Sequence, residues 1–167
     1  MQHHQPIADI GALTRRLLAS QIDFILVGGA AAVAHGSPTS TRDYDIVHSR
    51  AEANVARLLT VIAELDAFFR TDLSGGRLVP TAEHLRGHGQ ILLTTLLGPL
   101  DLLCELHDGR GFEELVPHSV MLDADGQALR VLDLPTLIEV KTAAGRPKDK
   151  LVVAELIVLL ERQMRGS

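Results

Sequence analysis

The feature that most limits the fold is a short apolar run, residues 24–27 (FILV), which ends at Gly28 and Gly29. Four consecutive apolar residues are too few for a helix and leave no polar face, so the run predicts a strand buried on both sides. The two glycines allow a tight junction after the strand, and the Ala-rich segment 28–36 predicts a short helix there. A buried strand followed at once by a helix favours a sheet covered by helices.

The rest of the chain predicts strands and helices in alternation, then hairpins, then helices. Helices are expected at 7–20, 51–69, 134–144 and 148–164, and a strand at 44–47. Hairpins are expected at 91–106, turning at Gly98-Pro99, and at 120–131, turning at Asp125-Gly126. We therefore expect one α/β (α+β) domain over residues 1–167: a mixed sheet flanked by helices, with a flexible tail at 1–6 and a C-terminal helical segment at 133–164.

Composition narrows the class of protein. Hydrophobic residues make up 46% of the 167 residues and aromatic residues only 3%, so the core must be built from aliphatic side chains. The formal net charge of −5 disfavours general capture of nucleic acid by a basic surface. The single cysteine, Cys104, excludes an intrachain disulfide. No signal-peptide pattern or membrane-length apolar stretch is evident, so a cytoplasmic protein with no membrane partner is expected.

Two aspartates open the second expected strand. Asp43 and Asp45 are two residues apart, so in a strand they project to the same side. Two aligned carboxylates are costly unless a cation neutralises them, and magnesium prefers oxygen ligands, including those of a nucleotide's phosphates. Two such ions would clamp an in-line displacement at phosphorus. Asp101, expected to open an otherwise apolar strand at a sheet end, is the candidate third carboxylate and base.

The ordered combination of Gly28-Gly29, a polar loop, Asp43-x-Asp45 and the later Asp101 resembles the nucleotidyltransferase superfamily related to DNA polymerase β. The segments 137–141 (LIEVK) and 144–149 (AGRPKD) are similar to the C-terminal portion of small bacterial stand-alone members, including the AbiEii toxin group. The resemblance covers roughly residues 24–47, 99–105 and 133–160.

The resemblance implies roles for individual residues. Gly28 and Gly29 would contact the triphosphate, assisted by hydroxyls of the 37–41 loop such as Ser40 and Thr41. Asp43, Asp45 and Asp101 would bind two Mg²⁺ ions, with Asp101 also the base. Lys141 would contact the triphosphate or the leaving group. Arg146 and Lys148 are candidates for nucleotide or polynucleotide contact, although a solvated helix start is the commoner role of such residues.

The chain departs from the family pattern at three positions. Gly29 stands where many members have serine. Tyr44 replaces the usual aliphatic residue between the two aspartates and would either offer a stacking surface or simply pack. Val152 stands three residues after Asp149, where a second acidic residue often follows.

The expected function is magnesium-dependent transfer of a nucleoside monophosphate from an NTP to a hydroxyl. The acceptor could be RNA or tRNA, a protein or a small molecule, and the sequence does not select among them. The NTP is also left open, with ATP as one candidate. A toxin–antitoxin component with a cognate partner is one version of this expectation. The alternative is a non-catalytic nucleotide-binding or protein-interaction module on the same fold.

Overall fold

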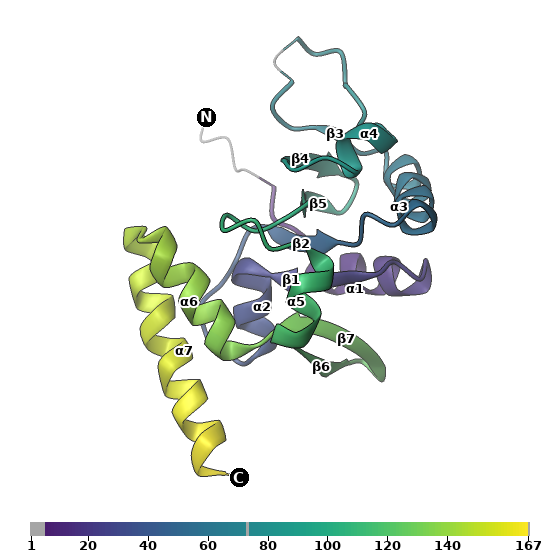
Figure 1. The fold of residues 1–167 in the computed structure, drawn as a ribbon. Helices are drawn as coiled ribbons and strands as arrows, with labels where there is room; N and C mark the ends of the chain where they lie inside the picture. The colour runs from purple at the N-terminus through teal and green to yellow at the C-terminus, as the bar shows by residue number, and fades with distance from the viewer. Residues whose placement is uncertain (1–5, 73, 167) are drawn as a thin grey trace.

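The computed structural model describes residues 6–72 and 74–166, which form a mixed sheet with helices packed around it (Figure 1). The expected tail at residues 1–6 falls outside the described residues except for Pro6. The strands are β1 (Phe24–Val27), β2 (Tyr44–His48), β3 (Phe68–Phe69), β4 (Gln90–Thr95), β5 (Gly98–Leu103), β6 (Ser119–Ala124) and β7 (Gln127–Leu132). The α-helices are α1 (Ile10–Ala19), α2 (Gly28–Ala34), α3 (Glu52–Glu64), α4 (Ala82–Leu85), α5 (Phe112–Leu115), α6 (Leu134–Ala144) and α7 (Pro147–Arg165), and Val116–His118 forms a 3₁₀ turn.

The seven-stranded sheet has the order β3-β4-β5-β2-β1-β7-β6. Its centre is mixed: β2 runs parallel to β5 and antiparallel to β1, while β1 runs parallel to β7. The mixed sheet flanked by helices that the sequence predicts is therefore confirmed. This order matters for function because it places β2, which carries the Asp-x-Asp pattern, directly beside β5, which carries Asp101.

The centre of the sheet is mostly buried and apolar, and it includes one buried tyrosine. All four residues of β1 are buried, as the uninterrupted apolar run predicts. Tyr44 is completely buried as well, and its hydroxyl makes a 2.7 Å hydrogen bond with Oγ1 of Thr14 on α1. Burial raises the pKa of Tyr44 to about 12. Of the two roles open to Tyr44, the structure therefore supports packing, because the ring offers no exposed face for stacking.

Helix α3 is shorter than the 51–69 helix predicted from the apolar pattern. It ends at Glu64, and the backbone reverses at Asp66, which has a φ of +49°. The N–H of Ala67 then bonds the carbonyl of Ile62, which closes the helix end. The chain continues into β3, which pairs with β4. The prediction failed here because the apolar residues continue past the helix end and hide the turn.

The turn of the β4–β5 hairpin also differs from the prediction. Gly98 and Pro99 do not form the turn but open β5, opposite Thr95 and Thr94 of β4. The turn is made by residues 96–97, and the hydroxyl of Thr95 closes it by accepting from the N–H of Leu97 at 3.0 Å and donating to the carbonyl of Gly98 at 2.7 Å. Asp101 consequently lies in the middle of β5 and not at its start.

The C-terminal helices are confirmed closely. Helix α6 stops at Gly145, whose φ of +63° suits a glycine, and α7 starts with Pro147 in its first turn. Helices α6 and α7 pack against each other, and α6 also contacts α2 (Figure 1). None of the helices in the described part of the chain is long and apolar enough to cross a membrane.

Candidate active site

The junction between β1 and α2 lies directly against Asp45. Asp45 is the register partner of Val27, the last residue of β1. Gly28 follows with a φ of +64°, and a Cβ atom there would stand only 2.8 Å from Oδ2 of Asp45. Gly28 therefore needs to be glycine both for its backbone conformation and for the close approach of the carboxylate.

Gly29 is constrained by a different neighbour. A Cβ atom at Gly29 would stand 2.5 Å from Oγ1 of Thr41, so the threonine side chain fills the space that a serine at position 29 would need. The Thr41 hydroxyl also donates to the backbone carbonyl of Asp43 at 3.2 Å. Gly28 lines the cleft described below, whereas Gly29, Ser40 and Thr41 are not among its lining residues. Thr41 thus holds the backbone just before β2 and does not itself line the cleft.

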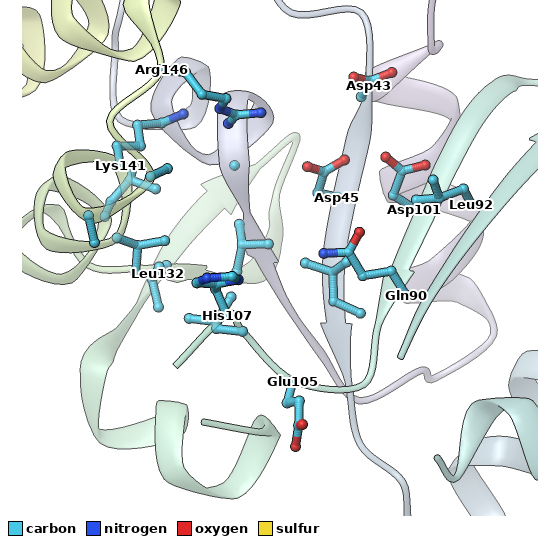
Figure 2. Close-up of a pocket in the computed structure, with 18 residues that line it drawn as sticks. Asp43, Asp45, Gln90, Leu92, Asp101, Glu105, His107, Leu132, Lys141 and Arg146 are labelled. Atoms are coloured by element: carbon cyan, nitrogen blue, oxygen red, sulfur yellow. The ribbon is translucent and has the colours of Figure 1, made fainter. Parts of the chain in front are cut away.

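Asp45 and Asp101 face each other across two parallel strands. They are register partners of β2 and β5, and Asp43 lies one residue before β2 begins. All three aspartates line the same cleft, with their carboxylates gathered on one side of it (Figure 2). The convergence expected of Asp43, Asp45 and Asp101 is therefore seen in the geometry.

The carboxylate of Asp45 is electrostatically strained. Its Oδ1 atom is buried and has no hydrogen-bond partner among the described residues. Burial first, and then the negative charge of Asp101, raises the pKa of Asp45 to about 7. A buried carboxylate oxygen without a donor beside a second carboxylate is an arrangement that a bound cation would relieve.

Arg70 is a functional candidate that the sequence did not reveal. Its Nη2 atom donates to Oδ1 of Asp101 at 2.7 Å. Arg70 follows β3 and lies just beyond the helix predicted for 51–69, where a lone arginine gave no signal of a contact with a residue 31 positions away.

The opposite wall of the cleft is cationic and comes from α6 and the start of α7. Lys141 and Arg146 face the carboxylates across the cleft (Figure 2). Burial lowers the pKa of Lys141 below its usual value, while Asp149 opposes this shift from 3.7 Å away. Lys148, the other basic candidate, is exposed and does not line the cleft.

Asp149 is the buried centre of this cationic wall. It accepts a 2.7 Å hydrogen bond from Nε of Arg146 and is 3% exposed. Burial alone would raise its pKa, but the hydrogen bond and the nearby positive charges outweigh it and hold the pKa below the usual range. Asp149, which was not among the predicted site residues, therefore holds the two cations that face the site.

Helix α7 also anchors the loop before β2. Glu155 accepts hydrogen bonds from Oγ of Ser37 at 2.8 Å and from Oγ1 of Thr39 at 2.5 Å. Val152 stands where a second acidic residue often follows Asp149. Glu155, three residues further on, supplies a polar contact of α7 with the loop that precedes Asp43.

The cleft between the two walls has a volume of about 520 Å³. Its remaining lining is mostly aliphatic, and Gln90, Glu105 and His107 add polar groups (Figure 2). Across the described residues, no group of three or more His, Cys, Asp or Glu side chains is arranged as a ready-made metal site. The oxygen donors and the unpartnered Asp45 Oδ1 nevertheless fit Mg²⁺, which commonly binds through one or two carboxylates together with phosphate oxygens.

Comparison with known proteins gives a clear result for the fold. No protein-family model matches the chain, and no curated protein matches it. Among solved structures, the lincosamide antibiotic adenylyltransferase LnuA, bound to lincomycin, is similar with a TM-score of 0.65 and 9% identity, covering 93% of this chain and 99% of LnuA. The antibiotic-resistance factor ANT(2'')-Ia is similar with a TM-score of 0.54 and 15% identity over 93% of this chain and 91% of its own.

A third similar structure is an antigenic nucleotidyltransferase-like protein from Paracoccidioides brasiliensis, with a TM-score of 0.53 and 16% identity over 93% of this chain and 78% of that one. These likenesses extend over nearly the whole chain at low sequence identity, and they bear on the fold. The chain has the fold of nucleotidyltransferases.

Proposed function

We propose that the protein is a magnesium-dependent nucleotidyltransferase that moves a nucleoside monophosphate from an NTP to a hydroxyl group. The observation that carries this proposal is the register pairing of Asp45 with Asp101, beside Asp43 and opposite Lys141, in one cleft. Three carboxylates on one wall and a buried cation on the other match the needs of a triphosphate whose α-phosphorus is attacked.

In this reaction the acceptor oxygen forms a bond to the α-phosphorus, and the bond from that phosphorus to the oxygen bridging to the β-phosphate breaks. The pyrophosphate leaves with the bonding electrons, and the acceptor proton passes to a carboxylate, for which Asp101 is the candidate base. Asp43, Asp45 and Asp101 would hold Mg²⁺, which when bound neutralises charge on the carboxylates and the triphosphate.

Lys141 is the candidate for stabilising the pyrophosphate as it leaves. Lys141 is 8% exposed and lines the cleft, and its ammonium group lies 3.7 Å from the carboxylate of Asp149. A cation fixed in a largely dry site stabilises developing negative charge without having to reorganise. Gly28 supports the same proposal, because it lines the cleft and lets the Asp45 carboxylate lie against the start of α2.

The similar solved structures suggest which class of acceptor to test first. LnuA, a lincosamide antibiotic adenylyltransferase bound to lincomycin, is matched over 99% of its length. A fold of this extent is therefore compatible with a small-molecule acceptor. We propose a small hydroxyl compound as the first acceptor class to test, with RNA, tRNA or a protein partner, including a toxin–antitoxin partner, as the other classes.

The test is a transfer experiment with each of the four α-³²P-labelled NTPs and Mg²⁺. Separate reactions contain total RNA, a protein lysate and a panel of hydroxyl-bearing small molecules that includes lincomycin. The matched control is Asp45→Asn, which keeps the size of the side chain. Label moved by the wild type and not by Asp45→Asn supports the proposal and identifies the acceptor class. Nucleotide binding without transfer in any pool supports the non-catalytic alternative.

A further inference from the structure

Arg70 is held rigidly against the acidic wall of the cleft. Its backbone N–H donates to the carbonyl of Leu92 at 2.9 Å, and its Nη1 donates to the carbonyl of Leu93 at 2.9 Å. Its Nη2 donates to Oδ1 of Asp101 at 2.7 Å. The guanidinium therefore bridges β4 and Asp101 with two hydrogen bonds, one from each terminal nitrogen. These bonds fix the orientation of the Asp101 carboxylate relative to β4.

This ion pair is largely shielded from water. The side chain of Asp101 is 12% exposed and that of Arg70 is 31% exposed. Arg70 brings a positive charge to a cluster of three carboxylates of which one oxygen, Asp45 Oδ1, has no partner among the described residues. The contact therefore does two things: it orients Asp101, and it offsets part of the negative charge that would draw a divalent cation.

We propose that Arg70 is a positioning residue that occupies one oxygen of Asp101, leaves the other for the acceptor or a metal ion, and weakens divalent-cation binding before the nucleotide arrives. The proposal rests on the function proposed above. It assigns Arg70 a role that differs from simple structural support, because it predicts opposite effects on metal affinity and turnover.

Removing the guanidinium should strengthen cation binding and slow the reaction. In Arg70→Met the carboxylate cluster loses a nearby positive charge, so the nucleotide-free protein should bind Mn²⁺ about tenfold more tightly. The same variant should turn over more slowly because Asp101 is no longer fixed. Arg70→Lys retains the charge but lacks the paired terminal nitrogens, so its Mn²⁺ affinity should stay close to that of the wild type while its kcat falls.

Arg77 provides a matched control in the neighbouring segment. It pairs with Oδ2 of Asp66 at 3.2 Å and lies over the ring of Phe68, and its side chain is 65% exposed. It does not line the cleft. Arg77→Met removes the same charge and side-chain type without touching Asp101, so its Mn²⁺ affinity and kcat should match those of the wild type.

The experiment measures Mn²⁺ binding by electron paramagnetic resonance on the full chain without nucleotide, for the wild type, Arg70→Met, Arg70→Lys and Arg77→Met. Asp101→Asn and Arg70→Met/Asp101→Asn complete a double-mutant cycle, in which the effect of Arg70→Met should become smaller when Asp101 is already neutral. Circular dichroism and thermal unfolding verify the fold of each variant.

The proposal is overturned if folded Arg70→Met binds Mn²⁺ as weakly as the wild type or more weakly, or if the gain is undiminished in the Asp101→Asn background. Absence of Mn²⁺ binding by every variant also overturns it. If Arg70→Met does not fold, Arg70→Lys decides: wild-type Mn²⁺ affinity with reduced kcat supports the proposal, and unchanged kcat contradicts it. Because Mn²⁺ binding is read without turnover, a failure of the proposed transferase activity remains distinguishable from a failure of this inference.

Discussion

Asp45 and Asp101 are register partners on two parallel strands, so their carboxylates stand at the same level of the sheet. The pair lies in a cleft whose other wall carries Lys141 and Arg146. Neighbouring carboxylates repel each other when both are ionised, and burial adds to the cost. The folded protein therefore carries an electrostatic penalty at this position, which a divalent cation would remove.

The first prediction follows from the raised pKa of Asp45. Its pKa is about 7 in the folded protein against an ordinary value of 3.8, so the folded state binds this proton more tightly than the unfolded state. That contribution favours folding near and below pH 4 and is lost as the pH rises through 7. Without metal, Asp45→Asn should gain stability relative to the wild type between pH 5 and pH 8, on the order of 2 kcal/mol.

Urea unfolding in EDTA at both pH values measures this difference. The comparison with Asp45→Asn cancels other titrating groups, including His48, whose pKa burial lowers. Added Mg²⁺ should restore the stability of the wild type at pH 8 and have little effect on the variant. An equal stability difference at pH 5 and pH 8 would show that Asp45 ionises normally.

The second prediction concerns Lys141. Lys141→Met keeps much of the side-chain volume and leaves Asp149 paired with Arg146, so the protein should still fold. Loss of the cation facing the cleft should lower kcat/KM about 100-fold. Lys150→Met, an exposed change on α7, is the control and should leave kcat/KM unchanged. Equal kinetics for the two variants would remove Lys141 from the site.

The third prediction concerns Gly29, which stands where many members of the superfamily have serine. Gly29→Ser should impair folding or activity, because its Cβ would stand 2.5 Å from the hydroxyl of Thr41. Thr41→Gly should restore part of the loss, because it removes both the hydroxyl and the Cβ atom of Thr41, which would stand 2.9 Å from the new Cβ. Thermal unfolding of the two single variants and the double variant measures the coupling. Strict additivity would mean that Thr41 does not exclude the serine.

The fourth prediction concerns the anchor of the loop before Asp43. Glu155→Ala removes the acceptor for Ser37 and Thr39, so the loop should become looser and the KM for the NTP should rise about three- to tenfold. Glu161→Ala is the matched control, because Glu161 is exposed on the same helix and pairs with Arg165. The idea fails if both variants have the KM of the wild type.

The parts of the site that depend on local chain geometry could be predicted from the sequence. The glycine pair predicted the tight junction at Gly28. The two-residue period of a strand predicted that Asp43 and Asp45 project to the same side. Asp101 was also predicted as the third carboxylate, but its place in the middle of β5 was not. The turn falls at residues 96–97, directly before the Gly98-Pro99 pair that indicated it in the sequence, and the Thr95 hydroxyl closes it.

The contacts that were missed join segments far apart in the chain. Arg70 reaches Asp101 only because β3 pairs with β4 and β4 with β5, and the end of α3 that sets this path is hidden by continuing apolar residues. Glu155 meets Ser37 across 118 positions. Such pairings depend on how the elements pack, which periodicity and local motifs do not encode.

The central claim is that this cleft transfers a nucleoside monophosphate, and the position of the transferred label tests it most directly. The protein is incubated with Mg²⁺ and the acceptor panel, using the same NTP labelled at the α-phosphate in one reaction and at the γ-phosphate in another. Our account predicts that the α-label moves to the acceptor, that the γ-label appears in pyrophosphate, and that Asp45→Asn does neither. Transfer of the γ-label, or equal α-label transfer by folded Asp45→Asn, would contradict it.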